Sequence, residues 1–152
     1  MSNPTVAPVA VTIRTAREED SASIALLATQ LGYPASTEEI RKRLCRILQA
    51  DADSAIVAEL ANGEVCGWIL VVSTISLTSA PRAEVAGLVV DQAMRGLGIG
   101  ARLLQAAMHW ATINDFAEVR VHSNTIRERA HQFYEREGFK RIKTQVLFGK
   151  LT

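Results

Sequence analysis

The segment from Val85 to Leu104 constrains this chain more than any other part of its sequence. An apolar run, Val85–Val90, is followed by residues 91–94, then by Arg95-Gly96-Leu97-Gly98-Ile99-Gly100 and an apolar-periodic stretch. The pattern predicts a strand, a short turn, a glycine loop and the beginning of a helix. Glycines have no Cβ to shield backbone N–H groups, and a helix N-terminus adds unpaired N–H groups and a positive dipole end. The segment therefore predicts a site for phosphate or pyrophosphate, with Arg95 as an additional cation.

Two other phosphate-binding motifs fit this segment less well. Gly96-x-Gly98-x-x-Ala101 matches the dinucleotide fingerprint, but in a dinucleotide fold the first glycine ends the strand, whereas residues 91–95 intervene here. The next predicted strand, around residues 119–121, ends in His122-Ser123-Asn124 and offers no carboxylate for a ribose hydroxyl. The Walker motif would need a Gly-Lys-Ser/Thr ending, which this loop lacks. A turn that merely connects strand and helix would not require three glycines and an arginine.

The glycine loop resembles the acetyl-CoA loop of the GNAT superfamily of N-acetyltransferases, whose pattern is Arg/Gln-x-x-Gly-x-Gly/Ala. A second segment, Ala130–Phe139, is similar to the later A-x-x-F-Y-x-x-x-G-F helix of that family. Ile13-Arg14-x-Ala16 and Gln30–Pro34 extend the resemblance upstream, so that it covers nearly the whole chain. We therefore expect one N-acetyltransferase domain over residues 9–152, preceded by a flexible tail at residues 1–8.

The resemblance implies that acetyl-CoA is the acyl donor. In GNAT enzymes the strand that corresponds to Val85–Val90 splays from its neighbour at a bulge and offers backbone N–H groups to the acyl-CoA. Gly87 suits a bulge or a close ligand approach, although packing under a helix would also explain it. On this interpretation Leu88 N–H faces the thioester oxygen and Val90 pairs with the pantetheine amides. The implied acetyl-CoA-binding residues are Leu88, Val89, Val90, Arg95, Gly96, Leu97, Gly98, Ile99, Gly100, Ala101, Asn124, Arg127, Ala130 and Phe133.

Two of these residues have an alternative role. Asn124 or Thr125 is placed to begin the last predicted helix, where a short polar side chain caps backbone N–H groups. Arg127 is placed to pair with a carboxylate on the surface of that helix. The sequence leaves cofactor binding and helix capping open for both positions.

Amide formation from a thioester needs a base, an oxyanion donor and an acid. A substrate amine with a pKa of about 10 is mostly protonated at neutral pH, so a base must take a proton before nitrogen attacks. The resemblance implies Tyr134 as the acid, because many GNAT enzymes point this tyrosine at the CoA sulfur; helical periodicity alone makes it a core residue. It also implies Glu84 as a base, the alternative being a solvated carboxylate. His122 is a second base candidate because its ordinary pKa of about 6.5 suits proton transfer, although strand-end histidines are more often merely exposed.

The sequence favours direct attack within a ternary complex. It contains neither a Ser-His-Asp order nor a G-x-S-x-G elbow, which would imply an acyl-enzyme. The three histidines lack metal-ligand spacing with one another or with Cys45 and Cys66, so we expect no metal. We interpret both cysteines as buried, reduced thiols rather than as nucleophiles.

Charge and hydropathy limit the partners. Lys and Arg number 17 and Asp and Glu 16, so no strongly basic field recruits nucleic acid or an anionic membrane. No apolar run approaches the roughly 20 residues of a spanning helix, and the N-terminus lacks signal-peptide features, so we expect a cytoplasmic protein. We expect a small-molecule primary amine as substrate, such as an aminoglycoside-like, polyamine or amino-acid compound. Tyr33, Thr78 and Arg82 are candidates to line its side of the cleft. A protein lysine or N-terminal amine, and a non-catalytic acyl-CoA-binding sensor, are the alternatives.

The order of the predicted elements gives the fold class. A strand over residues 9–13 is followed by a helix with Glu18-Glu19-Asp20 on its opening turn, and Ser36-Thr37-Glu38-Glu39 is a capping box for a second helix. Asn62-Gly63 joins two strands, and the cofactor strand, its helix to about Ile113, and a strand, helix and strand complete the order. This order predicts an α/β fold with a mixed, mostly antiparallel sheet of six to seven strands, splayed at the acyl-CoA site and flanked by four helices.

The C-terminal end is the ambiguous part of this expected fold. Fourteen residues follow Gly138, enough for two short strands or one longer strand. A single strand would leave a sheet edge for a second subunit to complete, whereas Lys140, Lys143 and Lys150 would blunt an exposed edge. We therefore expect a monomer or a homodimer.

Overall fold

The computed structural model describes residues 9–152, and the predicted tail at residues 1–8 lies outside the described residues. The chain forms two compact units, of which the first ends at Val121 and the second spans His122–Thr152. The first unit contains the whole sheet and three α-helices, and the second contains the last helix and the C-terminal segment.

The sheet of the first unit has five strands in the order β1-β2-β3-β4-β5. The first four strands are antiparallel to their neighbours, and β5 runs parallel to β4. This arrangement confirms the predicted mixed α/β class. The strands are β1 (Val11–Thr15), β2 (Asp53–Leu60), β3 (Val65–Thr74), β4 (Arg82–Val90) and β5 (Val119–Val121).

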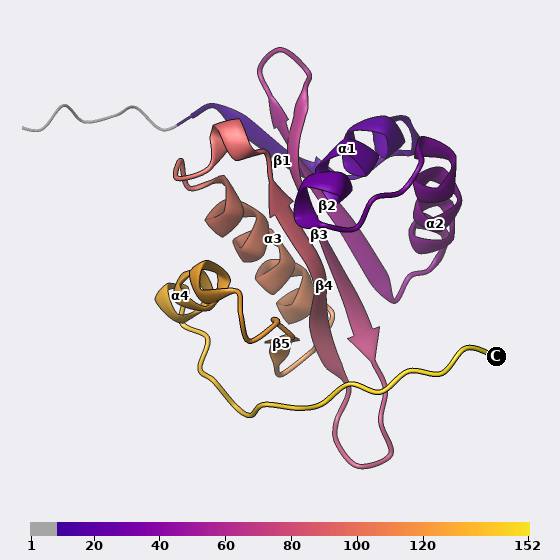
Figure 1. Cartoon of the computed structure of the whole chain (residues 1–152), viewed down its shortest axis with the longest axis vertical. Coiled ribbons are helices and arrows are strands. Elements are labelled where there is room, and N and C mark those ends of the chain that lie inside the picture. The colour runs from indigo at the N-terminus through magenta and orange to yellow at the C-terminus, as the bar shows by residue number, and fades with distance from the viewer. Residues whose placement is uncertain (1–8) are drawn as a thin grey trace, which may run out of the picture. The chain divides into compact units, whose positions relative to one another are not determined.

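Helices cover both faces of this sheet. Helices α1 and α2 lie on one face and α3 lies on the other (Figure 1). The second unit holds α4, and short 3-10 turns, η1 (Glu18–Asp20) and η2 (Gln92–Met94), precede α1 and α3. The helices are α1 (Ser21–Leu31), α2 (Thr37–Gln49), α3 (Ile99–Ile113) and α4 (Glu128–Arg136). Among residues 9–152, no helix is long and apolar enough to cross a membrane.

Local sequence signals explain several element boundaries. Ser36 begins α2 as predicted, because its hydroxyl accepts a hydrogen bond from Glu39 N–H at 3.1 Å and the Glu39 side chain reaches back. Gly32 ends α1 in the left-handed conformation, with φ of +100°, which an L-residue with a Cβ adopts only at a cost. Asn62-Gly63 turns the chain between β2 and β3, and the Asn62 side chain accepts from Glu64 N–H at 2.9 Å.

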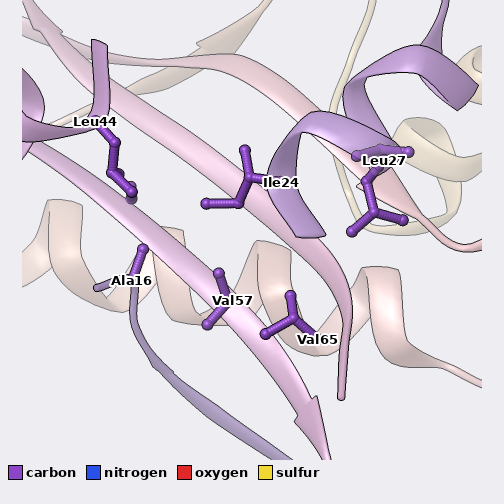
Figure 2. Close-up of a cluster of buried hydrophobic side chains, with 8 residues drawn as sticks. Ala16, Ile24, Leu27, Leu44, Val57 and Val65 are labelled. Carbon is purple, nitrogen blue, oxygen red and sulfur yellow. The ribbon is translucent and has the colours of Figure 1, made fainter. Parts of the chain in front are cut away.

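The core between α1, α2 and the sheet is built from aliphatic side chains. Ile24 and Leu27 of α1 and Leu44 of α2 pack with Val57 of β2 and Val65 of β3 (Figure 2). Val57 is fully buried and Leu27 is 2% exposed. Truncating either side chain to alanine removes methyl groups from the core, which costs about 2–5 kcal/mol for a leucine.

The acidic residues at the start of α1 have a role that differs from the prediction. Asp20 is 7% exposed and accepts two hydrogen bonds from the Arg14 guanidinium of β1, at 2.8 and 2.9 Å. Arg17 N–H donates a third, at 2.7 Å, and Arg14 also pairs with Glu59 of β2. The hydrogen bonds from Arg14 hold the pKa of Asp20 below its usual range. Asp20 therefore ties β1 to the start of α1 instead of only complementing the helix dipole.

The strand count differs from the expected six to seven. Every element of the predicted order is present except the last strand, because residues 139–152 have no regular secondary structure. Among the described residues no strand pairs with this segment, and Val146, Leu147 and Phe148 are 78%, 97% and 88% exposed. A strand forms only when a neighbouring strand takes its backbone hydrogen bonds, so this segment stays irregular.

Candidate functional site

Among the residues that the structure describes, the C-terminal half of β4 has no strand paired with it on the side of β5. β5 pairs with Ala83–Val85 only, whereas Gly87–Val90 pair with β3 on the opposite side. Within the described part of the chain, no strand pairs with residues 86–90 on the β5 side. We call this stretch the open edge of β4. It lies where the family resemblance implied that this strand splays from its neighbour.

A bulge interrupts β4 immediately before the open edge. Leu70 of β3 is opposite Gly87 and Val71 is opposite Val85, so Ala86 is the extra residue. A Cβ on Gly87 would lie 2.7 Å from Cζ3 of Trp68, closer than side chains tolerate. The predicted bulge is therefore present, and the group that approaches Gly87 is an indole from the neighbouring strand.

The bulge decides which N–H groups face the open edge. Ala83 N–H donates toward β5, at 3.1 Å, and Asp91 N–H donates to a β3 carbonyl, at 2.8 Å. Successive residues of a strand point their N–H groups to opposite sides, and an extra residue reverses the pattern. Counting back from Asp91, Val89 N–H faces β3, and the N–H groups of Leu88 and Val90 face the open edge. Val89 is otherwise a core residue, 4% exposed.

The turn after β4 is held in place by side chains. The Asp91 carboxylate accepts from the N–H group two residues later at 2.8 Å. Gln30, at the end of α1, accepts from Gln92 N–H at 3.0 Å. Arg95 Nε donates to the Val90 carbonyl at 3.2 Å. Arg95, predicted as a cation for the phosphates, therefore also connects the turn to the strand. Gln30 stabilises the same turn, which the sequence pattern did not reveal.

The glycine loop owes its composition to backbone conformation rather than to crowding. Gly96 and Gly98 have φ of +78° and +81°, and no heavy atom lies within 4 Å of a Cβ built on either. Gly98 caps α3, and the first intrahelical hydrogen bond runs from Arg102 N–H to Gly98 O at 3.2 Å. The N–H groups of residues 99–101 therefore have no partner within the helix, and they lie at the positive end of its dipole. Ile99, 2% exposed, anchors this helix end in the core.

Glu84 lies on β4 before the bulge and is half-buried. It is opposite Val72 of β3, and its Oε2 accepts a hydrogen bond from the Thr74 hydroxyl at 3.3 Å. Paired residues share a face of the sheet, as do alternate residues of one strand. Glu84 is therefore on the same face as Leu70 and Trp68.

A cavity of about 320 Å³ adjoins that face. It is bounded by α1, α2, strands β2 and β3, and the β4 bulge. Tyr33, predicted to face the substrate, lines it, together with Arg43 and Trp68. Thr78 and Arg82, predicted with Tyr33, do not; their side chains bond within the loop between β3 and β4. Sequence reasoning missed the cavity because its walls come from separate elements with no common motif.

Tyr134 lies on α4 in the second unit. Its ring contacts Phe133 and Phe139, at 5.1 and 5.6 Å between ring centroids. Burial raises the pKa of Tyr134 to about 12, and the positive charge of Arg127 acts in the opposite direction. The phenol therefore stays protonated at neutral pH, as a proton donor must. The ring contacts are also those of the alternative, a packed core residue.

The turn before α4 is organised by Asn124. Its side chain accepts from Ile126 N–H at 3.2 Å, and its carbonyl contacts the His131 ring Nε2 at 2.9 Å. This Asx turn delays the helix, so α4 begins at Glu128 rather than at Asn124 or Thr125 as the capping alternative supposed. Arg127 immediately precedes the helix.

The other site residues that were predicted in the second unit are His122, Ala130 and Phe133. His122 is exposed, at the first position of the unit. Ala130 and Phe133 are half-buried on α4, and the Phe133 ring lies 5.9 Å from the Arg136 guanidinium.

Neither cysteine has the features of a nucleophile. Burial raises the pKa of the Cys66 thiol, which donates to the Ala58 carbonyl at 3.5 Å. Cys45 is half-buried, more exposed than predicted. In residues 9–152, no group of three or more His, Cys, Asp or Glu side chains is placed to hold a metal ion.

Comparison with known proteins identifies the family. The model of the acetyltransferase (GNAT) family matches residues 17–139, a span that includes the open edge, the glycine loop and α4. The chain belongs to the GNAT acetyltransferase family. No curated protein gave a significant sequence match.

Solved structures share the GNAT fold at low sequence identity. A transcriptional regulator from Bacillus halodurans C-125 is 24% identical, with a TM-score of 0.81 over 93% of this chain and 100% of that chain. AAC(6')-Iy in complex with a bisubstrate analogue, CoA-S-monomethyl-acetylneamine, is 19% identical, with a TM-score of 0.83 over 94% and 99%. Glucosamine-6-phosphate N-acetyltransferase from Arabidopsis thaliana is 19% identical, with a TM-score of 0.79 over 92% and 98%. These likenesses establish the fold.

Proposed function

We propose that this chain is an acetyl-CoA-dependent N-acetyltransferase that acts on the primary amine of a small molecule by direct attack. The observation that carries the proposal is the open edge of β4, where the bulge turns the N–H groups of Leu88 and Val90 outward before the short turn that leads to the glycine loop. An acyl-CoA thioester and its pantetheine amides need N–H donors in a row, and the pyrophosphate needs a helix N-terminus beyond them.

The reaction divides among the predicted residues as follows. Glu84 accepts a proton from the substrate ammonium, directly or through water, and the free amine attacks the thioester carbon. Leu88 N–H donates to the oxyanion that forms. The C–S bond breaks as the intermediate collapses, the nitrogen loses its second proton to solvent, and Tyr134 donates a proton to the sulfur. The pKa of Tyr134, about 12, lies above that of a thiol, about 8.5, so the proton transfer to sulfur is uphill by itself and is completed when solvent reprotonates the phenolate. His122 is the alternative base.

A thiol-release assay tests the proposal. The chain is incubated with acetyl-CoA and a library of amines, free CoA is followed with a thiol reagent, and the product is identified by mass. We expect amine-dependent release of one CoA per acetyl group transferred. Protein substrates form a separate arm, in which lysine peptides and peptides with free N-termini replace the small amines.

A non-catalytic acyl-CoA sensor is the second candidate, favoured by the likeness to a protein described as a transcriptional regulator. Tight CoA binding without turnover of any amine or peptide would favour the sensor and contradict the enzyme.

A further inference from the structure

The side chains that line the cavity between α1, α2 and the sheet indicate what kind of acceptor amine it can hold. We propose that it holds an acceptor amine whose amino group is separated by an aromatic or branched aliphatic body from a carboxylate or similar anion. Polycationic sugars and polyamines are excluded from this site. The inference rests on the proposed function, because it takes the cavity as the acceptor side of the acetyl-transfer site.

The walls of the cavity are apolar side chains from four elements. Ile24 and Leu31 come from α1, Ile40 and Ile47 from α2, Val57 from β2 and Leu70 from β3. Its volume of about 320 Å³ is at the lower end of the range for small-molecule sites, about 300–1,000 Å³. Burial of an apolar body against these walls would contribute roughly 25 cal/mol per Å² removed from water.

One end of the cavity adjoins the open edge. Ala86 and Gly87, the bulge residues, form part of its lining, and Leu88 follows them directly. Glu84 is on the same face of the sheet, opposite Val72, which is two residues beyond Leu70 along β3. An amino group at this end would therefore lie on the face of the sheet that carries Glu84, although Glu84 is not in the lining, and next to the residue whose N–H group is assigned to the thioester oxygen.

The polar groups of the lining favour a ligand that carries an anion and a hydrogen-bond acceptor, and they disfavour a ligand with a second positive charge. Arg43 is the single charged side chain in the lining, and no carboxylate is among the described residues that line the cavity. Its side chain is 64% exposed, and its Nη2 forms an ion pair with Glu39 at 3.9 Å, a distance too long for a hydrogen bond. Trp68 Nε1, which is buried, has no hydrogen-bond partner, and such a donor costs about 1–3 kcal/mol until an acceptor reaches it.

The test compares four amine probes with the full chain. 4-(Aminomethyl)phenylacetate carries an aromatic body and a carboxylate, 4-methylbenzylamine carries the body alone, and spermidine and kanamycin are polycations. We expect kcat/KM to be at least tenfold higher for the carboxylate probe than for either polycation. Arg43→Gln should lower kcat/KM at least tenfold for the carboxylate probe and less than threefold for 4-methylbenzylamine. Arg46→Gln, an exposed arginine of the same helix outside the cavity lining, is the matched control and should change neither.

A filling variant tests the location. Ile47→Phe should raise KM for both aromatic probes and leave the affinity for CoA unchanged, with the melting temperature as a check on folding. Preference for spermidine or kanamycin, or equal losses for all probes in Arg43→Gln, would overturn the inference. So would a higher kcat/KM for hexanoyl-CoA than for acetyl-CoA that Ile47→Phe abolishes, because the cavity would then hold the acyl chain.

Binding separates failure of this inference from failure of the proposed function. Calorimetry with the carboxylate probe and the CoA-saturated chain needs no turnover. Probe binding that weakens in Arg43→Gln but not in Arg46→Gln supports the inference even if no acetyl transfer occurs. Absence of probe binding at millimolar concentration contradicts it even if another amine is acetylated.

Discussion

The open edge with its glycine loop and the cavity beside it offer different kinds of groups to a ligand. The first presents backbone N–H groups, through an unpaired strand edge, positive-φ glycines and a helix end. The second presents side chains, such as Arg43 and Trp68, from elements distant in sequence. A backbone site accepts any ligand with the right spacing of acceptors, whereas a side-chain site changes with each substitution. Donor recognition should therefore be common to GNAT proteins, and acceptor recognition should belong to this chain.

The largest effect expected is that of a side chain on Gly98. Gly98→Val places a branched side chain where the pyrophosphate would lie and forces a valine to φ of +81°, so CoA affinity should fall more than a hundredfold in calorimetry. Gly63→Val is the matched control, since Gly63 has φ of +87° and a Cβ on it would meet only Glu59 Oε1, at 3.9 Å, but it lies in the hairpin between β2 and β3. Unchanged CoA affinity in folded Gly98→Val would remove the cofactor from this loop.

Tyr134→Phe asks whether the second unit supplies chemistry that neither region of the first unit contains. It removes one hydroxyl and keeps the ring contacts, so kcat should fall roughly a hundredfold with acetyl-CoA affinity almost unchanged. The loss should shrink at acidic pH, where solvent protonates the thiolate more easily. Tyr33→Phe, at the other tyrosine, is in the lining of the cavity, so it should change KM for the amine more than kcat. Parental turnover of Tyr134→Phe, where chemistry limits the rate, would leave Tyr134 as a core residue.

The raised pKa of Tyr134 also makes a prediction about pH. A phenol with a pKa of about 12 stays protonated throughout the usual assay range, so its deprotonation should cause no fall in kcat between pH 7 and pH 10. Because the folded-state pKa is above the unfolded value of about 10, the stability gained from this group is complete below pH 10 and is lost as pH rises toward 12. Denaturant unfolding at several alkaline pH values, with Tyr134→Phe as reference, measures this contribution.

Arg95 should matter less than the glycines. Its guanidinium is exposed and its Nε already donates to the Val90 carbonyl, so Arg95→Ala should weaken CoA binding about tenfold, in line with roughly 1.5 kcal/mol for a charged hydrogen bond. Arg102→Ala, within α3, is the control and should have little effect. A hundredfold loss in Arg95→Ala with Gly98→Val unaffected would mean that side chains, not backbone, hold the phosphates.

The smallest effect belongs to Gly100. It lies in the first turn of α3, where alanine has a better helix propensity than glycine by about 1 kcal/mol. Gly100→Ala should leave CoA affinity within twofold and raise the melting temperature slightly. A loss comparable to that of Gly98→Val would contradict the assignment of the two glycines to different roles.

The contrast between the two regions also explains what the sequence could predict. The glycine loop, the bulge near Gly87 and the capping box at Ser36 are local, because a turn, a bulge or a cap needs particular residues at adjacent positions. In the sequence, Arg43 has the pattern of a solvent-exposed helix residue and Trp68 that of an ordinary strand residue. Only the tertiary packing of α2 and β3 brings both into the lining of one cavity. The last strand was expected and is absent. Its formation depends on a neighbouring strand to pair with, and the sequence of residues 139–152 does not specify one.

Amide spectra of the ¹⁵N-labelled chain test the central claim most directly, namely that the open edge of β4 binds the acetyl-CoA thioester arm. Titration with acetyl-CoA should shift the N–H resonances of Leu88 and Val90 strongly and that of Val89, which faces β3, much less. Titration with CoA alone should reproduce the shifts of Gly98 to Ala101 but change the Leu88 shift, because the thioester oxygen is missing. Saturating acetyl-CoA that left Leu88 and Val90 unshifted while other strands responded would contradict the account.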